Sequence, residues 1–180
     1  MKNTFLKTIG GAALAILMMA MFAQVQVSAQ DIIDEAQSNE QTQEDLSTRR
    51  ENTRKLEGSW NLQVTPRNCQ TGVPGSTVAV MQTFMRGGTM IDFGGVLSPS
   101  LRTPGQGVWS YQSRRQYSIA FQFFRFNADG TPAGRQIQRG QIEMSRDGNS
   151  YTATGMGQIL DAGGNVIANT CGTSTATRFQ

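Results

Sequence analysis

The sequence predicts an all-β protein, an eight-stranded antiparallel up-and-down β-barrel that follows a signal peptide and a polar linker. First, from Gly58 onward, alternating apolar and polar segments are separated by turns rich in Gly, Asp and Asn, as in hairpin-connected strands. Second, no convincing helical period occurs among these segments. Third, two residue pairs place the first and last strands side by side, so that the sheet closes and loses its exposed edges.

The first 29 residues have the composition of a secretory signal peptide. Lys2 and Lys7 precede an uncharged run at residues 9–23, and small residues follow at 27–29, which is the order of a cleavable signal. The run is shorter than the about 20 residues that a membrane-spanning helix needs. We therefore expect cleavage after Ala29, a secreted or periplasmic protein, and no stable membrane insertion after cleavage.

Residues 30–56 predict a polar linker, and residues 57–180 predict the barrel domain. The linker is rich in Gln, Glu and Arg and holds few apolar side chains. These are too few to offset the entropy cost of ordering the chain. A partly helical stretch is expected near residues 44–56, and a partner-binding tail is the alternative interpretation of this segment.

The first four strands are expected at residues 58–66, 76–86, 88–93 and 107–113. In each, apolar residues recur at every second position, which predicts a strand with one buried face. The residues expected on these faces are Trp60, Leu62, Val64, Val78, Val80, Gln82, Phe84, Ile91, Phe93, Trp109 and Tyr111. Asp92 has the opposite parity to Ile91 and Phe93, so we expect it to face outward. A loop at 94–106 precedes the fourth strand.

The last four strands are expected at residues 116–127, 135–145, 150–160 and 166–179. The first of them carries aromatic residues on both faces. The strand at 135–145 has polar and apolar residues on both faces. The face that carries Arg139, Gln141 and Glu143 is either a solvated outer face or a polar inner wall. Residues 150–160 bear a face of small residues, Ala153, Gly155 and Gly157. Such a face either leaves interior volume unfilled or marks a bend that helps the barrel close.

Two pairs of residues indicate that the barrel closes. Paired residue numbers in antiparallel neighbours have a constant sum, and Cys69–Cys171 and Trp60–Arg178 give almost the same sum. One register therefore brings both pairs together between the first and last strands. Two Cys in an exported chain predict one disulfide, with a reactive thiol pair as the alternative. Trp60 and Arg178 predict a cation–π stack at one barrel end.

The Gly58-x-Trp60 opening of the first strand, with Arg178 after the last strand, resembles the signature of the lipocalins and the wider calycin superfamily. In that superfamily the Arg packs over the Trp at the closed end of the barrel, and the resemblance covers residues 57–180. The stretches Thr-Pro-Arg-Asn-Cys at 65–69 and Gly-Gly-Thr at 87–89 also resemble secreted bacterial proteins of unassigned function. The allene-oxide-cyclase barrel is similar in shape. The resemblance implies an eight-stranded barrel, whose interior holds side chains or one small ligand.

The composition excludes several classes of chemistry. The chain has no His, which removes the usual general base and the commonest zinc ligand. No metal-ligand cluster, cofactor motif or nucleophile constellation is present in the sequence, so we expect no catalytic residue, metal or cofactor. Loss of Lys2 and Lys7 with the signal peptide brings the formal net charge from +3 close to neutral, which gives no argument for a nucleic-acid partner.

These observations favour a barrel that binds a small apolar or amphipathic molecule non-covalently, rather than an enzyme. The ligand would bind at the end away from Trp60 and Arg178, with residues 94–107 as the candidate lid. The candidate ligand-binding side chains are Phe84, Phe93, Tyr117, Phe121, Phe123, Arg139 and Gln141. The alternatives are a cyclase or isomerase that steers its substrate in a shaped cavity, and an interaction module with a filled barrel.

Overall fold

The computed structural model describes residues 45–48, 50–52 and 55–179. The predicted signal peptide and most of the predicted linker lie outside these residues. Residues 45–48 and 50–52 are helical. In the part of the chain that the structure describes, no helix is long and apolar enough to cross a membrane.

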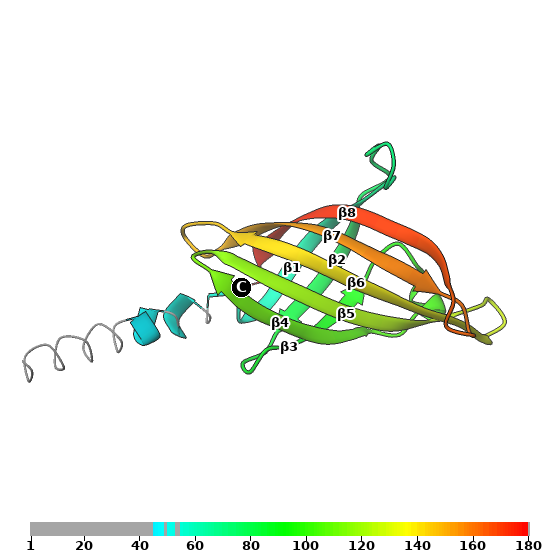
Figure 1. The fold of residues 1–180 in the computed structure, drawn as a ribbon, viewed down its shortest axis with the longest axis horizontal. Helices are drawn as coiled ribbons and strands as arrows, with labels where there is room; N and C mark the ends of the chain where they lie inside the picture. Colours follow the sequence, from blue (N-terminus) through cyan, green and yellow to red (C-terminus); the bar gives the residue numbers. More distant parts are fainter. Residues whose placement is uncertain (1–44, 49, 53–54, 180) are drawn as a thin grey trace, which may run out of the picture. The chain divides into compact units, whose positions relative to one another are not determined.

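Eight antiparallel strands form a closed barrel in which every strand pairs with its neighbour in sequence and β1 pairs with β8 (Figure 1). This confirms the predicted all-β, eight-stranded up-and-down barrel. The strands are β1 (Gly58–Arg67), β2 (Val78–Phe84), β3 (Thr89–Gly94), β4 (Gly105–Ser113), β5 (Gln116–Phe126), β6 (Pro132–Met144), β7 (Ser150–Leu160) and β8 (Val166–Arg178). A short 3-10 helix, η1 (Pro99–Leu101), lies in the loop between β3 and β4.

β6 begins three residues earlier than the turn-rich sequence around Gly130 predicts. Gly134 lies inside the strand with φ +109°, and a Cβ there would lie 2.0 Å from the carbonyl oxygen of Leu160. The register between β5 and β6 shifts beside it, between Arg125 and Phe126. Glycine at 134 therefore belongs to an irregular strand start, where the backbone of β7 comes very close, rather than to the hairpin turn itself.

The closing register between β1 and β8 is the one that the sequence predicts. Trp60 lies opposite Arg178, and Arg67 lies opposite Cys171. Cys69, two residues beyond the end of β1, forms a disulfide with Cys171, with 5.3 Å between their Cα atoms. The pairing of first and last strands is thus held by backbone hydrogen bonds and by one covalent bond.

The predicted inward face of β3 is wrong. Asp92 faces the interior and is 3% exposed, whereas Phe93 is 60% exposed on the outer surface. The reason is the register with β2, which pairs Gln82 with Asp92 and Phe84 with Met90. The inward face of β2 therefore continues into Met90 and Asp92, and not into Ile91 and Phe93.

The mixed strand β6 has its even-numbered residues inside. The register with β5 places Ile142 beside the buried Tyr117 and Gln138 beside Phe121. Arg139, Gln141 and Glu143 are exposed on the outer face, which is the solvated-face alternative of the prediction. A polar inner wall does exist on β6, but Gln136 and Gln138 form it.

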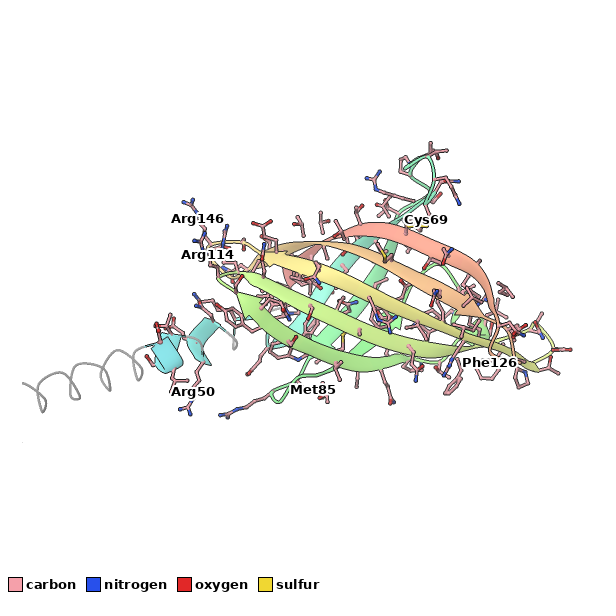
Figure 2. All side chains as sticks on the ribbon, viewed as in Figure 1. Arg50, Cys69, Met85, Arg114, Phe126 and Arg146 are labelled. Carbon is pink, nitrogen blue, oxygen red and sulfur yellow. A yellow bond between two sulfur atoms is a disulfide. The ribbon has the colours of Figure 1, made fainter. Side chains whose placement is uncertain are left out.

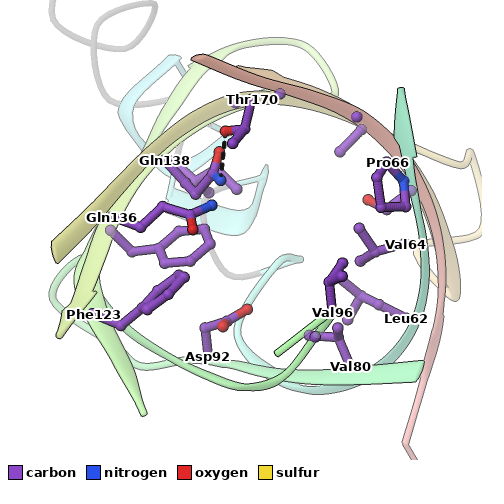
Figure 3. A pocket seen from close by; sticks show the side chains of 18 of the residues that line it. Leu62, Val64, Pro66, Val80, Asp92, Val96, Phe123, Gln136, Gln138 and Thr170 are labelled. Atoms are coloured by element: carbon purple, nitrogen blue, oxygen red, sulfur yellow. Dashed lines mark hydrogen bonds between the residues drawn. The ribbon is translucent and has the colours of Figure 1, made fainter. Parts of the chain in front are cut away.

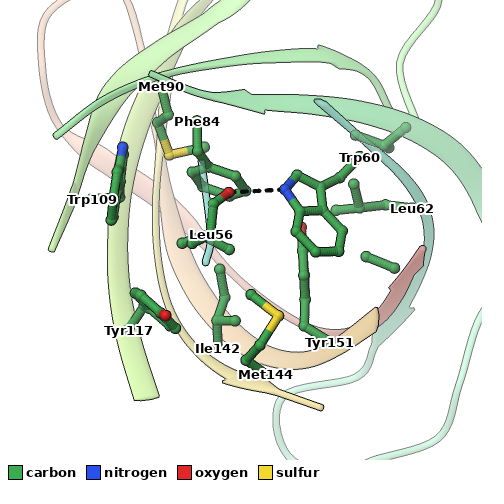
Figure 4. Close-up of a cluster of buried hydrophobic side chains, with 12 residues drawn as sticks. Leu56, Trp60, Leu62, Phe84, Met90, Trp109, Tyr117, Ile142, Met144 and Tyr151 are labelled. Carbon is green, nitrogen blue, oxygen red and sulfur yellow. Dashed lines mark hydrogen bonds between the residues drawn. The ribbon is translucent and has the colours of Figure 1, made fainter. Parts of the chain in front are cut away.

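The apolar core occupies one end of the barrel, which we call the closed end and define by Trp60 and Arg178. Trp60 lies 4.9 Å from Tyr151, measured between ring centroids, and its indole nitrogen donates to the carbonyl oxygen of Leu56 at 2.9 Å (Figure 4). Leu56 is fully buried, so the core includes the last residue of the predicted linker. Other fully or nearly fully buried members are Leu62, Phe84, Met90, Tyr117, Ile142 and Met144.

The two ends of the barrel differ in their loops. Figure 2 shows Arg114 and Arg146, from the β4–β5 and β6–β7 hairpins, at one end, and Phe126 at the other. The Arg178 guanidinium donates to the carbonyl oxygen of Gly148 at 3.0 Å, so the hairpin that carries Arg146 belongs to the closed end. The opposite end, near Phe126, is the open end.

Candidate ligand cavity

A cavity of about 360 Å³ lies inside the barrel. Figure 3 shows aliphatic side chains on one side, from β1, β2 and the β3–β4 loop, and polar and aromatic side chains on the other. The aliphatic side consists of Leu62, Val64, Pro66, Val80 and Val96, and the facing side of Phe123, Gln136, Gln138 and Thr170. An interior with one apolar wall and a few polar groups is the usual form of a small-molecule site.

The cavity exists because small residues meet on three adjacent strands. Gly140 pairs with Gly155, and Gly155 pairs with Gly172, so a row without side chains crosses β6, β7 and β8. All three glycines border the cavity. Gly157 has a different role, because a Cβ there would lie 2.2 Å from the carbonyl oxygen of Ile137. Of the two interpretations of the small face, Gly155 supports unfilled volume because it borders the cavity, whereas Gly157 is required by the close approach of the neighbouring backbone.

A chain of buried polar side chains separates the cavity from the closed-end core. The Tyr151 hydroxyl donates to Gln82 Oε1 at 3.0 Å, and Gln82 Nε2 donates to Asp92 Oδ1 at 3.1 Å. The other Asp92 oxygen accepts from the Arg102 guanidinium at 2.8 Å. Burial raises the pKa of Asp92 above its ordinary value, while the hydrogen bond from Gln82 and the charge of Arg102 act in the opposite direction. Asp92 is tolerated inside the barrel because both its oxygens are paired.

Arg102 comes from the β3–β4 loop and is fully engaged by its surroundings. Besides the ion pair with Asp92, its guanidinium donates to the carbonyl oxygens of Gly94 and Thr103. It also lies over the Phe123 ring, 3.6 Å from the ring centroid, in a cation–π geometry. This set of contacts fixes the loop against the barrel wall and makes Arg102 part of the cavity boundary.

The structure separates the predicted ligand-binding residues into three groups. Phe121 and Phe123 border the cavity. Phe84 and Tyr117 are buried in the closed-end core. Phe93 is on the outer surface, because the register with β2 turns Asp92 inward. Gln141 is on the outer face of β6, and Arg139 borders the cavity from the same strand although its side chain is exposed outside.

The prediction placed Gln82 on the inward face of its strand, with Val80 and Phe84, and Gln82 is buried there. The prediction did not name Gln82 as a site residue, and nothing in the sequence indicated its partner Asp92. Arg125, which shares the parity of Phe121 and Phe123 on β5, was not named either. No sequence signal connects Asp92 to Arg102, because the ion pair depends on how the loop folds back.

Among the described residues, no group of three or more His, Cys, Asp or Glu is placed to hold a metal ion. No protein-family model matches this chain, and no curated protein matches it. The closed eight-stranded antiparallel barrel is compatible with a lipocalin-like fold. The function must therefore be argued from the cavity and the residues around it.

The buried tyrosines predict a loss of stability in alkali. Burial raises the pKa of Tyr117 to about 12 and also raises that of Tyr151, with the Asp92 charge adding to the latter effect. An unfolded tyrosine ionises near pH 10, so above that pH the folded chain holds more protons than the unfolded chain. The free energy of unfolding should then fall as pH rises from about 10. Urea unfolding at a series of pH values measures this dependence.

Tyr151→Phe provides the control for this prediction. The variant loses the hydrogen bond to Gln82 at every pH, but it should show a shallower decline in unfolding free energy above pH about 10, because one titrating group is gone. A decline of equal slope in both proteins would contradict the role of Tyr151. A free energy of unfolding that stays constant over this range would contradict the raised pKa of both tyrosines.

Proposed function

We propose that this protein is an exported, lipocalin-like barrel that binds a small apolar or amphipathic molecule non-covalently. The observation that carries the proposal is the cavity of about 360 Å³ within the barrel, a volume inside the range of about 300–1,000 Å³ that small-molecule sites occupy. Further support comes from Arg178, whose guanidinium lies 4.3 Å from the Trp60 ring centroid, the arrangement that the resemblance implies. The disulfide is compatible with an oxidising compartment outside the cytoplasm.

The proposed access route lies beside the β3–β4 loop. Val96 and Leu97 from this loop border the cavity, and Val96 is 67% exposed to solvent. An apolar side chain that contacts both cavity and solvent is expected at the mouth of a site for an apolar ligand. Residues 94–107, which the sequence suggests as a lid, therefore include the proposed entrance to the cavity. The volume of the cavity also favours a binding protein over an interaction module with a filled barrel.

The test is to fill the cavity and measure binding. Ala153 is inside, borders the cavity and pairs with Ser174, another wall residue, so Ala153→Leu places an isobutyl group in the ligand volume. We expect saturable binding of a fluorescent apolar probe to the native protein, and at least a tenfold rise in Kd for the variant, which is about 1.4 kcal/mol. A panel of fatty acids and retinoids should compete with the probe.

Thr152→Leu is the matched control. Thr152 is the preceding residue on the same strand, and its side chain is exposed outside. The same added apolar bulk should leave the Kd unchanged there, and both variants should retain a cooperative unfolding transition. Absence of saturable binding across the panel, or equal loss of binding in both variants, would count decisively against a ligand site inside the barrel.

A further inference from the structure

The side chain of Arg125, a cation at the cavity, has no partner among the residues that the structure describes. Arg125 has the inward parity of β5 and borders the cavity. Its Nε is buried without a hydrogen-bond partner, and its guanidinium makes no hydrogen bond or ion pair with the residues that the structure describes. A buried donor on a charged group that is left unpaired costs free energy, so such a group calls for an explanation.

The Asp92 carboxylate, which pairs with Arg102, is not available as a partner for Arg125. The backbones of Arg102 and Arg125 pair in an isolated antiparallel bridge, and both residues border the cavity, where Asp92 is the only acid among the described wall residues. Asp92 is already paired, with Arg102 on one oxygen and Gln82 on the other. Among the described residues of the cavity wall, Arg125 is therefore a cation of inward parity that has no acidic partner.

A second polar group faces the same space without a partner. Gln136 lies on β6 and pairs with Phe123 of β5. Two residues before it on β6, Gly134 pairs with Arg125. Its side chain points into the cavity in Figure 3, and its amide makes no hydrogen bond to any described residue. Gln138, the next inward-facing residue along the same strand, has a partner, because its amide donates to the Thr170 hydroxyl at 2.9 Å. Arg125 and Gln136 thus lie on neighbouring strands, and neither side chain has a partner among the described residues.

We propose that Arg125 and Gln136 bind the anionic head group of the ligand, and that this head group is a carboxylate. The inference rests on the proposed function and specifies its ligand. A guanidinium donates a planar fork of N–H groups that matches a carboxylate, and the Gln136 amide adds a further donor. The apolar remainder of the ligand lies against Leu62, Val64 and Val80, on the facing wall.

Decanoate is a suitable probe for this site. Its carboxylate matches the guanidinium fork of Arg125, and its ten-carbon chain supplies the apolar part that the aliphatic wall would contact.

The experiment compares three ligands that share one chain: decanoate, decanol and decylamine. Calorimetric titration of the folded protein should give a Kd for decanoate at least tenfold below that for decanol, with decylammonium weakest because its charge repels Arg125. In Arg125→Gln, decanoate should lose roughly tenfold or more in affinity, the size expected for hydrogen bonds to a charged group. Decanol should bind this variant as tightly as it binds the native protein.

Two further variants keep the test interpretable. Arg135→Gln removes an exposed Arg from the outer face of β6, away from the cavity wall, and should change none of the three affinities. Arg125→Lys keeps the charge without the planar fork and should bind decanoate with intermediate affinity, which also covers a failure of Arg125→Gln to fold. Equal affinity for decanoate and decanol, or equal weakening of both by Arg125→Gln, would overturn the carboxylate site and leave the proposed function intact. No saturable binding of any of the three would overturn the proposed function and, with it, this inference.

Discussion

Replacing Cys69 and Cys171 together with serine should lower the free energy of unfolding by about 4.7 kcal/mol, the chain-entropy value for a loop of about 100 residues. The disulfide joins residues that are 102 positions apart, so in the unfolded chain it ties together almost the whole barrel domain. Without it, the unfolded state gains conformational freedom while the hydrogen bonds between β1 and β8 remain in the folded state. Urea unfolding of the oxidised native protein and the double-serine variant measures the difference.

The slope of the unfolding free energy against urea should distinguish this mechanism from damage to the folded state. An uncrosslinked unfolded chain exposes more surface, so the slope should rise in the double-serine variant. The control is thiol chemistry on the native protein: no free thiol should be labelled, and electrophoretic mobility should differ with and without reductant. Two labelled thiols in the folded native protein would refute the bond, and equal stability of the two proteins would refute its contribution.

The closure of the barrel was predictable from sequence because antiparallel geometry makes register a matter of residue numbers. Once Trp60 was placed opposite Arg178, the position of Cys171 near Cys69 followed, and the structure has that register. Alternating apolar residues also located all eight strands to within a few residues. These signals are local or pairwise, and each can be read from the chain without knowledge of the loops.

The face of β3 was not predictable in this way. Parity along the strand favours Ile91 and Phe93 as the inward residues, since both are apolar, but Asp92 is inside with Met90. Burial of Asp92 depends on Gln82 from the neighbouring strand and on Arg102 from the following loop. A sequence pattern records the polarity of a residue and not the partner that neutralises it, so a paired internal charge looks like a surface residue.

Whether a part of the interior is packed core or cavity depends on the residues that lie side by side on several neighbouring strands. The sequence of one strand alone does not show which residues these are. At the closed end, large side chains such as Trp60, Trp109 and Tyr151 meet and fill the space. Toward the open end, one row contains Gly140, Gly155 and Gly172. Each glycine alone is equally compatible with a bend. Only the register of β6, β7 and β8 brings the three together and leaves a volume that a ligand can occupy.

Replacing Trp60 with alanine should lower the free energy of unfolding by about 3–5 kcal/mol, as for other large-to-small core changes. Its side chain is fully buried, contacts the Tyr151 ring and lies under the Arg178 guanidinium. Arg178→Ala loses the cation–π contact, worth about 0.5–2 kcal/mol. It also loses hydrogen bonds to the carbonyl oxygens of Lys55 and Glu57 at 2.6 and 2.8 Å.

The cation–π contact is the part that the two residues share, so a double-mutant cycle isolates it. In urea unfolding, the losses from Trp60→Ala and Arg178→Ala should fall short of additive by about 0.5–2 kcal/mol. Trp109 packs against Phe84 and Tyr117 instead, so the cycle of Trp109→Ala with Arg178→Ala should be nearly additive. Ligand binding should survive in the single variants, since the cavity lies beyond the closed-end core. A coupling energy near zero for Trp60 and Arg178 would make their stacking incidental and would remove the main support for a lipocalin-like assignment.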